Sequence, residues 1–233
     1  MNSSVLARSF ASLALGLVLA MPATSHAEGG TIKGSAKFAG KVAAAAELNM
    51  KSDPFCAKGK AVDESVVVNA KGGIANVVVR IAKGAAADAA VPATEVVLDQ
   101  KGCNYSPHVA VAVAGQSVAI KNSDQTLHNV HTYKGPATLF NNAQPQGFPA
   151  IKKKFKTGDV VRFKCDVHPW MTAWVVVVDN AHYAVSGADG SYTLPDVPPG
   201  KYTVEAWHEK FGSKTAEVEV KAGKPLDLNF DFK

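Results

Sequence analysis

The sequence predicts an all-β protein made of two β-sandwiches, and three observations indicate this. Short apolar or β-branched runs recur between Gly, Asn or Asp turn signals, at residues 31–38, 66–68, 77–81, 95–98, 109–113, 118–120 and 160–163. After residue 179 the runs are short and alternating, with Asp189-Gly190 as a hairpin signal and a Pro-Pro-Gly turn at 198–200. The spacing of runs and turns is typical of sandwiches. One alanine-rich stretch, 42–48, is a candidate for a short helix.

The N-terminus has the pattern of a secretory signal peptide. Arg8 lies in a short leading region, residues 10–20 are apolar, and a small-x-small cleavage site ends at Ala27. The apolar core is too short to span a membrane. We therefore predict a signal peptide over residues 1–27, no membrane span, and a periplasmic mature protein.

The charge balance is mildly basic, with a formal net charge of +5 at pH 7. The run Lys152-Lys153-Lys154 is not interleaved with aromatic residues, and no nucleic-acid-binding signature accompanies it. We predict no nucleic-acid partner and interpret the run as a solvated edge. A basic face can still steer an acidic redox partner.

The most informative stretch is VVRFKCDVHPWMTAWVVVVD, residues 160–179, which predicts a strand, a tight loop and a strand. Its loop spaces Cys165, His168 and Met171 as C-x2-H-x2-M. A thiolate, an imidazole and a thioether together suit copper, and a trigonal His2Cys site with a weak axial Met needs one more imidazole. His128, in the upstream segment SVAIKNSDQTLHNVHT, offers it.

These motifs resemble the small blue copper proteins, the cupredoxins, and within them the amicyanin and pseudoazurin group. That group shares a Cys-x-x-His-Pro-aromatic-Met loop that leads into a valine-rich strand, and a His-Asn-Val segment that carries the first ligand. The resemblance implies one type 1 copper ion held by His128, Cys165, His168 and Met171. It also implies a Greek-key β-sandwich, which we place at residues 51–179.

The resemblance carries further expectations about the surroundings of the metal. The backbone N–H near Asn129 is expected to bond the thiolate sulfur, and His168 is expected at the solvent edge, inside an apolar rim of Pro169 and Trp170. Three features depart from the family pattern. Leu127 stands where a proline often precedes the first ligand, a carboxylate (Asp166) follows the cysteine, and His131 is a spare imidazole. Because positions 128 and 131 of a strand face opposite sides, we predict that His131 is not a ligand.

The cysteine count predicts one disulfide. In an oxidising compartment, three cysteines form one pair and leave one thiol with another purpose. With Cys165 assigned to the metal, Cys56 and Cys103 are the predicted pair. The competing interpretation is an intermolecular disulfide through Cys165.

The C-terminal segment, residues 180–233, resembles the carboxypeptidase regulatory-like (transthyretin-like) β-sandwich, on the phrase GADGSYTLPDVPPGKYTVEAWHEKFG. Such modules are generally non-catalytic, so the resemblance implies architecture alone. The segment is short for a self-sufficient sandwich. We therefore expect an N-terminal extension, residues 28–50, to contribute strand 31–38 to its sheet.

Together these patterns predict a secreted, non-enzymatic copper protein that transfers electrons by cycling between Cu(I) and Cu(II). No second copper-cluster motif, such as repeated His-x-His pairs, indicates an oxidase or a nitrite reductase. Two alternatives remain open: a periplasmic copper-binding and trafficking protein, and a non-redox β-sandwich interaction module with a vestigial site. The sequence leaves the electron donor and acceptor, the reduction potential and the oligomeric state undetermined.

Overall fold

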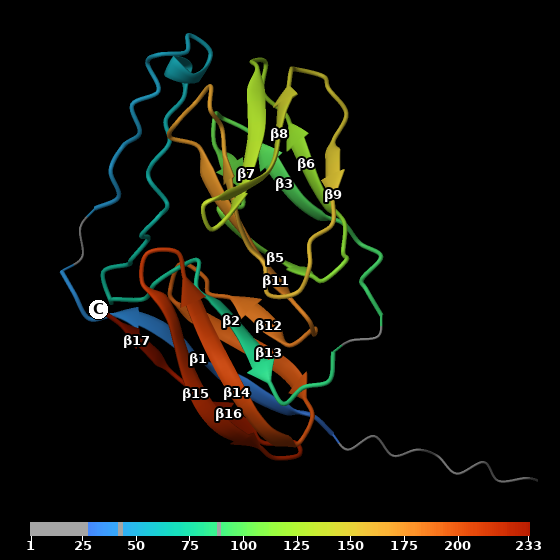
Figure 1. Ribbon diagram of the computed structural model, residues 1–233. Helices are drawn as coiled ribbons and strands as arrows, with labels where there is room; N and C mark the ends of the chain where they lie inside the picture. Colours follow the sequence, from blue (N-terminus) through green and yellow to red (C-terminus); the bar gives the residue numbers. More distant parts are fainter. Residues whose placement is uncertain (1–27, 42–43, 88–89) are drawn as a thin grey trace, which may run out of the picture.

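The computed structural model describes residues 28–41, 44–87 and 90–233, and Figure 1 shows two β-sandwiches stacked one above the other. The predicted signal peptide lies outside the described residues. Within them, every regular element is a strand except one 3-10 turn, η1 (Cys56–Lys58). No helix among the described residues is long and apolar enough to cross a membrane. The predicted all-β class is confirmed.

The upper sandwich in Figure 1 consists of two sheets that enclose one apolar core. The larger sheet has the strand order β5 (Val109–Val113), β11 (Thr172–Val178), β10 (Val160–Lys164), β7 (His128–Lys134), β8 (Ala137–Gln144). The facing sheet has the order β4 (Tyr105–Ser106), β3 (Val96–Gln100), β6 (Val118–Asn122), β9 (Ile151–Lys153). Phe163 and Met171 are among the largest side chains buried between the two sheets.

The lower sandwich draws its strands from both ends of the chain. One sheet has the order β13 (Ser191–Val197), β1 (Gly30–Phe38), β16 (Pro225–Asp227), and β17 (Phe230–Phe232) also pairs with β1. The other has the order β12 (Tyr183–Val185), β2 (Val78–Lys83), β14 (Gly200–His208), β15 (Gly212–Val220). β1 is therefore central in its sheet, between the antiparallel β13 and the parallel β16 and β17.

Strand β2 corrects the expected division of the chain. It lies within the range 51–179 assigned to the copper domain, yet it pairs antiparallel with β12 and β14 of the lower sandwich. Its inward side chains, Val79 and Ile81, join the lower core, while Val78 faces the upper sandwich. A local apolar run predicts a strand but does not specify its partner, because strand pairing is decided over long sequence distances.

The two sandwiches share an apolar interface, which explains the sequence VAVAV of β5. Its alanines face the upper core, and Val109, Val111 and Val113 pack against Val78 of β2 and the outward valines of β11. Both faces of β5 are thus buried, as a continuous apolar strand requires. A T-shaped contact between Trp174 and Trp207, with ring centroids 5.6 Å apart, lies beside this interface.

Two local expectations were wrong in detail, and two strands were not predicted. Residues 44–48 of the alanine-rich stretch form no helix, and Glu47 makes only an isolated bridge to Val62. The run 66–68 is likewise no strand, because only Val68 forms a bridge, to Ile74. The polar segment between His131 and Val160 also contains two strands, β8 and β9, that no apolar run in the sequence predicted. Polar residues obscured β8, which is largely exposed.

Deleting residues 28–40 is expected to unfold the lower sandwich, because β1 is the central strand of one of its sheets and Ile32 and Ala36 are fully buried there. Differential scanning calorimetry of the truncated chain should show loss of that sandwich's transition. An unchanged melting profile would contradict this role of β1.

His208 is expected to make stability depend on pH. Burial lowers the pKa of this imidazole to about 4, well below its ordinary value, since it stacks on Phe211 in the lower core. Below its unfolded pKa the unfolded chain binds more protons, so stability falls as pH drops from about 6.5 towards 4, by up to about 3 kcal/mol. Urea unfolding of the metal-free protein across this range should show a smaller loss for His208→Phe than for the unchanged protein. Equal losses would refute the assignment.

Candidate metal centre

The predicted ligands come from the ends of two neighbouring strands, β7 and β10, and from the loop that connects β10 to β11. His128 begins β7, Cys165 directly follows β10, and His168 and Met171 lie in the turn between β10 and β11. β10 pairs antiparallel with both β7 and β11, so the start of β7 and the end of β10 meet at one end of the sheet. This pairing brings residues 128 and 165 together although they are 37 positions apart in the sequence.

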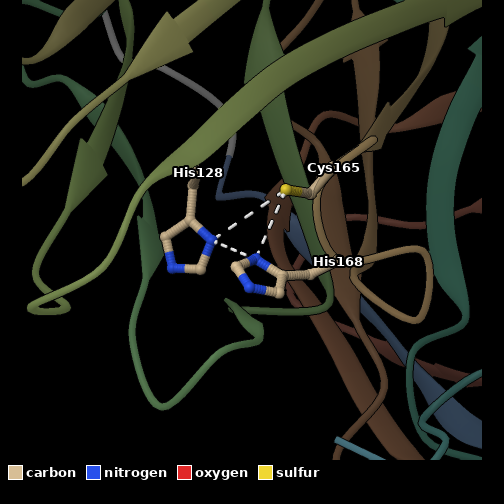
Figure 2. Close-up of side chains that lie close together, drawn as sticks. All are labelled: His128, Cys165 and His168. Atoms are coloured by element: carbon tan, nitrogen blue, oxygen red, sulfur yellow. Dashed lines mark hydrogen bonds between the residues drawn. The ribbon is translucent and has the colours of Figure 1, made fainter. Parts of the chain in front are cut away.

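Three of the four predicted ligands converge on one point, as Figure 2 shows. The Nδ1 atoms of His128 and His168 lie 2.9 Å apart, and the Sγ atom of Cys165 lies 3.9 Å and 3.7 Å from them. One ion bonded at about 2.0 Å to each nitrogen and about 2.3 Å to the sulfur fits separations below about 4 Å. All three side chains are buried.

Met171, the predicted axial ligand, is also fully buried and lies in the same apolar cluster as Cys165. Its backbone N–H donates a hydrogen bond of 2.9 Å to the carbonyl oxygen of His168, which closes the ligand turn. The expected position of its sulfur as an axial ligand stays a prediction.

Carboxylates hold the far side of both imidazoles. Asp124 Oδ2 lies 2.9 Å from Nε2 of His128, and Asp53 Oδ2 lies 3.0 Å from Nε2 of His168. Since an ionised carboxylate only accepts hydrogen bonds, each Nε2 carries the proton and each neutral ring presents an unprotonated Nδ1. Two lone pairs facing each other at 2.9 Å, next to a thiol sulfur, favour a cation. The donor set therefore fits a metal ion.

Burial and hydrogen bonding oppose one another at both residues, and the net pKa shifts favour a neutral His128 imidazole and an ionised Asp53 carboxylate. Burial lowers the pKa of His128, and its hydrogen bond to Asp124 opposes only part of that shift, so the neutral, metal-binding form is favoured. Burial alone would raise the pKa of Asp53. Hydrogen bonds from His168, from the backbone of Cys56 and from Thr126 hold that pKa well below its usual value.

The ligand loop is fixed by Asn129. Its backbone N–H points at the Cys165 sulfur, 3.5 Å away, at the position expected from the family resemblance. Its side-chain Oδ1 accepts hydrogen bonds from the backbone N–H groups of Asp166, at 2.6 Å, and Val167, at 3.3 Å. One residue next to a ligand thus supports both the sulfur and the turn that carries it.

The two departures at Asp166 and His131 are explained by each other. Both carboxylate oxygens of Asp166 lie 3.0 Å from Nδ1 of His131, and its Oδ2 also accepts from the side-chain amides of Asn129 and Asn141. Among the described residues, His131 belongs to none of the clusters able to hold a metal. These hydrogen bonds oppose the effect of burial and lower the pKa of Asp166.

One expectation about the site was wrong. His168 is not at the solvent edge, since it is only 1% exposed. The segment around η1 covers it: besides the Asp53 contact, Cys56 Sγ lies 3.6 Å from His168 Nε2. Trp170 packs beside the ring, with centroids 5.1 Å apart, and donates its indole N–H to the carbonyl oxygen of Cys103. No sequence signal indicated this cover, because it reaches the site from more than 100 residues away.

The predicted disulfide joins Cys56 to Cys103, while Cys165 is a free, buried cysteine. Sequence reasoning missed the carboxylates on either side of this bond. Asp124, four residues before His128, was open to local inspection. Asp53 was not, since nothing near residue 53 indicates its partner.

Comparison with known proteins agrees with the C-terminal resemblance. Residues 161–233 match the family model described as the carboxypeptidase regulatory-like domain. The matched range begins within β10, so it also includes strands of the upper sandwich. No curated protein sequence matches the chain.

Several solved structures match with low overall similarity. A purple cupredoxin from Nitrosopumilus maritimus is 22% identical to this chain, with a TM-score of 0.32. The match covers 35% of this chain and 98% of the cupredoxin. A reduced amicyanin variant is 26% identical, with a TM-score of 0.33. The match covers 42% of this chain and 97% of the amicyanin. A copper-containing nitrite reductase from Thermus scotoductus is 20% identical, with a TM-score of 0.34, covering 42% of this chain and 25% of its own.

Replacing both Cys56 and Cys103 by Ser is expected to destabilise the metal-free protein by about 4 kcal/mol, because the crosslink closes a loop between residues 47 positions apart. Urea unfolding measures this change. Cys165→Ser, which leaves the disulfide intact, is the matched control. A double variant as stable as that control would contradict the prediction.

Proposed function

We propose that the protein binds one copper ion through His128, Cys165, His168 and Met171 and transfers single electrons in the periplasm. The observation that carries this proposal is the convergence of two imidazole Nδ1 atoms and one thiol sulfur, all within 3.9 Å of one another, in a buried site. A mixed nitrogen and sulfur set of this kind suits copper in both oxidation states. Bound copper would supply the one-electron couple.

The chain's own residues prepare the site for that role. Two carboxylates fix the tautomer and orientation of the imidazoles, as outer partners of metal-ligating histidines do. The Asn129 N–H stabilises a thiolate at Cys165, and β7, β10 and the closed turn restrain the donor positions. A site that changes little between oxidation states lowers the reorganisation required for electron transfer.

A redox partner is part of this proposal, and exposed apolar side chains beside the ligands support one. Leu127 and Val167 are each 45% exposed and each directly precedes a ligand histidine. Such a surface suits brief docking of a partner protein. We propose no enzymatic activity for the chain.

The enclosure of His168 favours a second candidate function, the binding and delivery of copper. An imidazole that is 1% exposed and held by Asp53 gives a redox partner no direct contact with the ligand edge, which favours a protein that carries the ion over one that passes electrons. Protein-film voltammetry separates the two functions. A reversible one-electron couple supports electron transfer, and its absence in a copper-loaded protein supports copper delivery.

Adding Cu(II) to the metal-free protein is expected to give an intense visible thiolate-to-copper absorption band that saturates at one equivalent. Cys165→Ser should abolish the band, because the thiolate supplies the electron density for that transition. His131→Gln, which removes an imidazole outside the converging donor set, is the control and should keep the band. A protein without the band, or a band that survives Cys165→Ser, would refute the proposed site.

A further inference from the structure

The side chain of Asp53 reaches the candidate metal centre from the segment that leads into η1. Its Oδ2 atom lies 3.0 Å from Nε2 of His168 and accepts a second hydrogen bond of 2.9 Å from the hydroxyl of Thr126. Its other oxygen, Oδ1, accepts the backbone N–H groups of Phe55 and Cys56, which begin η1. All four interactions converge on one carboxylate, so its position relative to His168 is closely defined.

The disulfide ties this carboxylate to the one that holds the other imidazole. Cys56 donates its N–H to Asp53, and Cys103 donates its N–H to Asp124 Oδ2 at 2.8 Å. Each sulfur of the disulfide therefore lies in a cluster with one carboxylate and one imidazole: Cys56 with Asp53 and His168, and Cys103 with Asp124 and His128. The bond between the two sulfurs joins the groups on the side of the imidazoles away from the converging Nδ1 atoms.

The backbone at Gly102 and Cys103 has a conformation that directs two N–H groups at Asp124. Gly102 and Cys103 have φ values of 66° and 56°, in the left-handed region, which is unusual for cysteine. In this conformation both successive N–H groups point at the Asp124 carboxylate, at 2.6 Å and 2.8 Å. Consecutive amides arranged in this way form an anion-binding nest. Unfavourable backbone geometry is thus retained where it anchors a partner of His128.

We propose that Asp53 is a positioning residue for the metal ligand His168, and that the disulfide-tethered segment carrying it, residues 50–59, tunes the site. Asp53 holds His168 in the tautomer that presents Nδ1 to the metal. Its negative charge stabilises Cu(II) relative to Cu(I) and so lowers the reduction potential. The segment also encloses the ion and slows its loss. This inference rests on the proposed copper site and adds the origin of its potential and metal retention.

If Asp53 had a purely structural role, that role would consist of its hydrogen bonds from the backbone N–H groups of Phe55 and Cys56 at the start of η1. The Asp53→Asn variant separates the roles, because its side-chain oxygen can still accept from Phe55 and Cys56, while an amide group replaces the oxygen facing His168. Asp63→Asn is the matched control. Asp63 Oδ1 accepts the N–H of Ser65 two residues on, at 2.8 Å, as Asp53 accepts that of Phe55, and Asp63 is exposed.

Three measurements test the proposal on the full-length mature chain. Asp53→Asn should weaken Cu(II) binding by about 10- to 100-fold in competition with a chelator. Its reduction potential should shift to a higher value, and copper should transfer faster to excess chelator. In the metal-free protein, long-range ¹H–¹⁵N spectra of the imidazoles should show Nε2–H of His168 in the unchanged protein and a mixture of tautomers in the variant. Asp63→Asn should match the unchanged protein in each measurement.

The outcomes distinguish this inference from the proposed function. If Asp53→Asn equals Asp63→Asn in copper affinity, reduction potential and tautomer, the positioning role is refuted, even where a reversible couple supports electron transfer. If the unchanged protein binds copper without a reversible couple, electron transfer fails. In that case a loss of affinity and a changed tautomer in Asp53→Asn still support positioning.

Discussion

The hydrogen bonds from two imidazole rings to two carboxylates fix the geometry of the candidate site. Nδ1 of His128 and Nδ1 of His168 face one another at 2.9 Å because each ring donates its other nitrogen to a carboxylate. Without those carboxylates either ring could turn or take the other tautomer. The geometry of the candidate site therefore depends on Asp53 and Asp124 as much as on His128, His168 and Cys165.

The rest of the upper sandwich supplies fixed positions for these groups. β10 lies between β7 and β11, so Cys165 is bounded by strands on both sides, and Phe163 fills the core immediately below it. On the outer face of the same sheet, β5 and β11 are covered by the lower sandwich through valine contacts. These two strands are thus buried on both faces, whereas β8 at the opposite edge of the sheet is largely exposed.

Much of this arrangement followed from local patterns. The spacing of Cys165, His168 and Met171, with His128 upstream, predicted which donor atoms meet, and three of the four converge as expected. The cysteine count predicted the disulfide. The strand β1 was expected to complete the C-terminal sheet, to which it belongs, whereas the same reasoning left β2 in the wrong sandwich. Alternation shows that a segment is a strand, but it contains no information about which distant strand will pair with it.

The sequence by itself determined the all-β class of this protein and the donor side chains of the candidate site: one thiol and two imidazoles, with a thioether in the same loop. Only the tertiary structure decided how that chemistry is enclosed. Asp53 and His168 are 115 residues apart, and nothing local to either predicts their contact. The ligands lie within strands and turns that have short-range patterns, while the enclosure depends on a non-repetitive segment that the disulfide and its hydrogen bonds fold over the site.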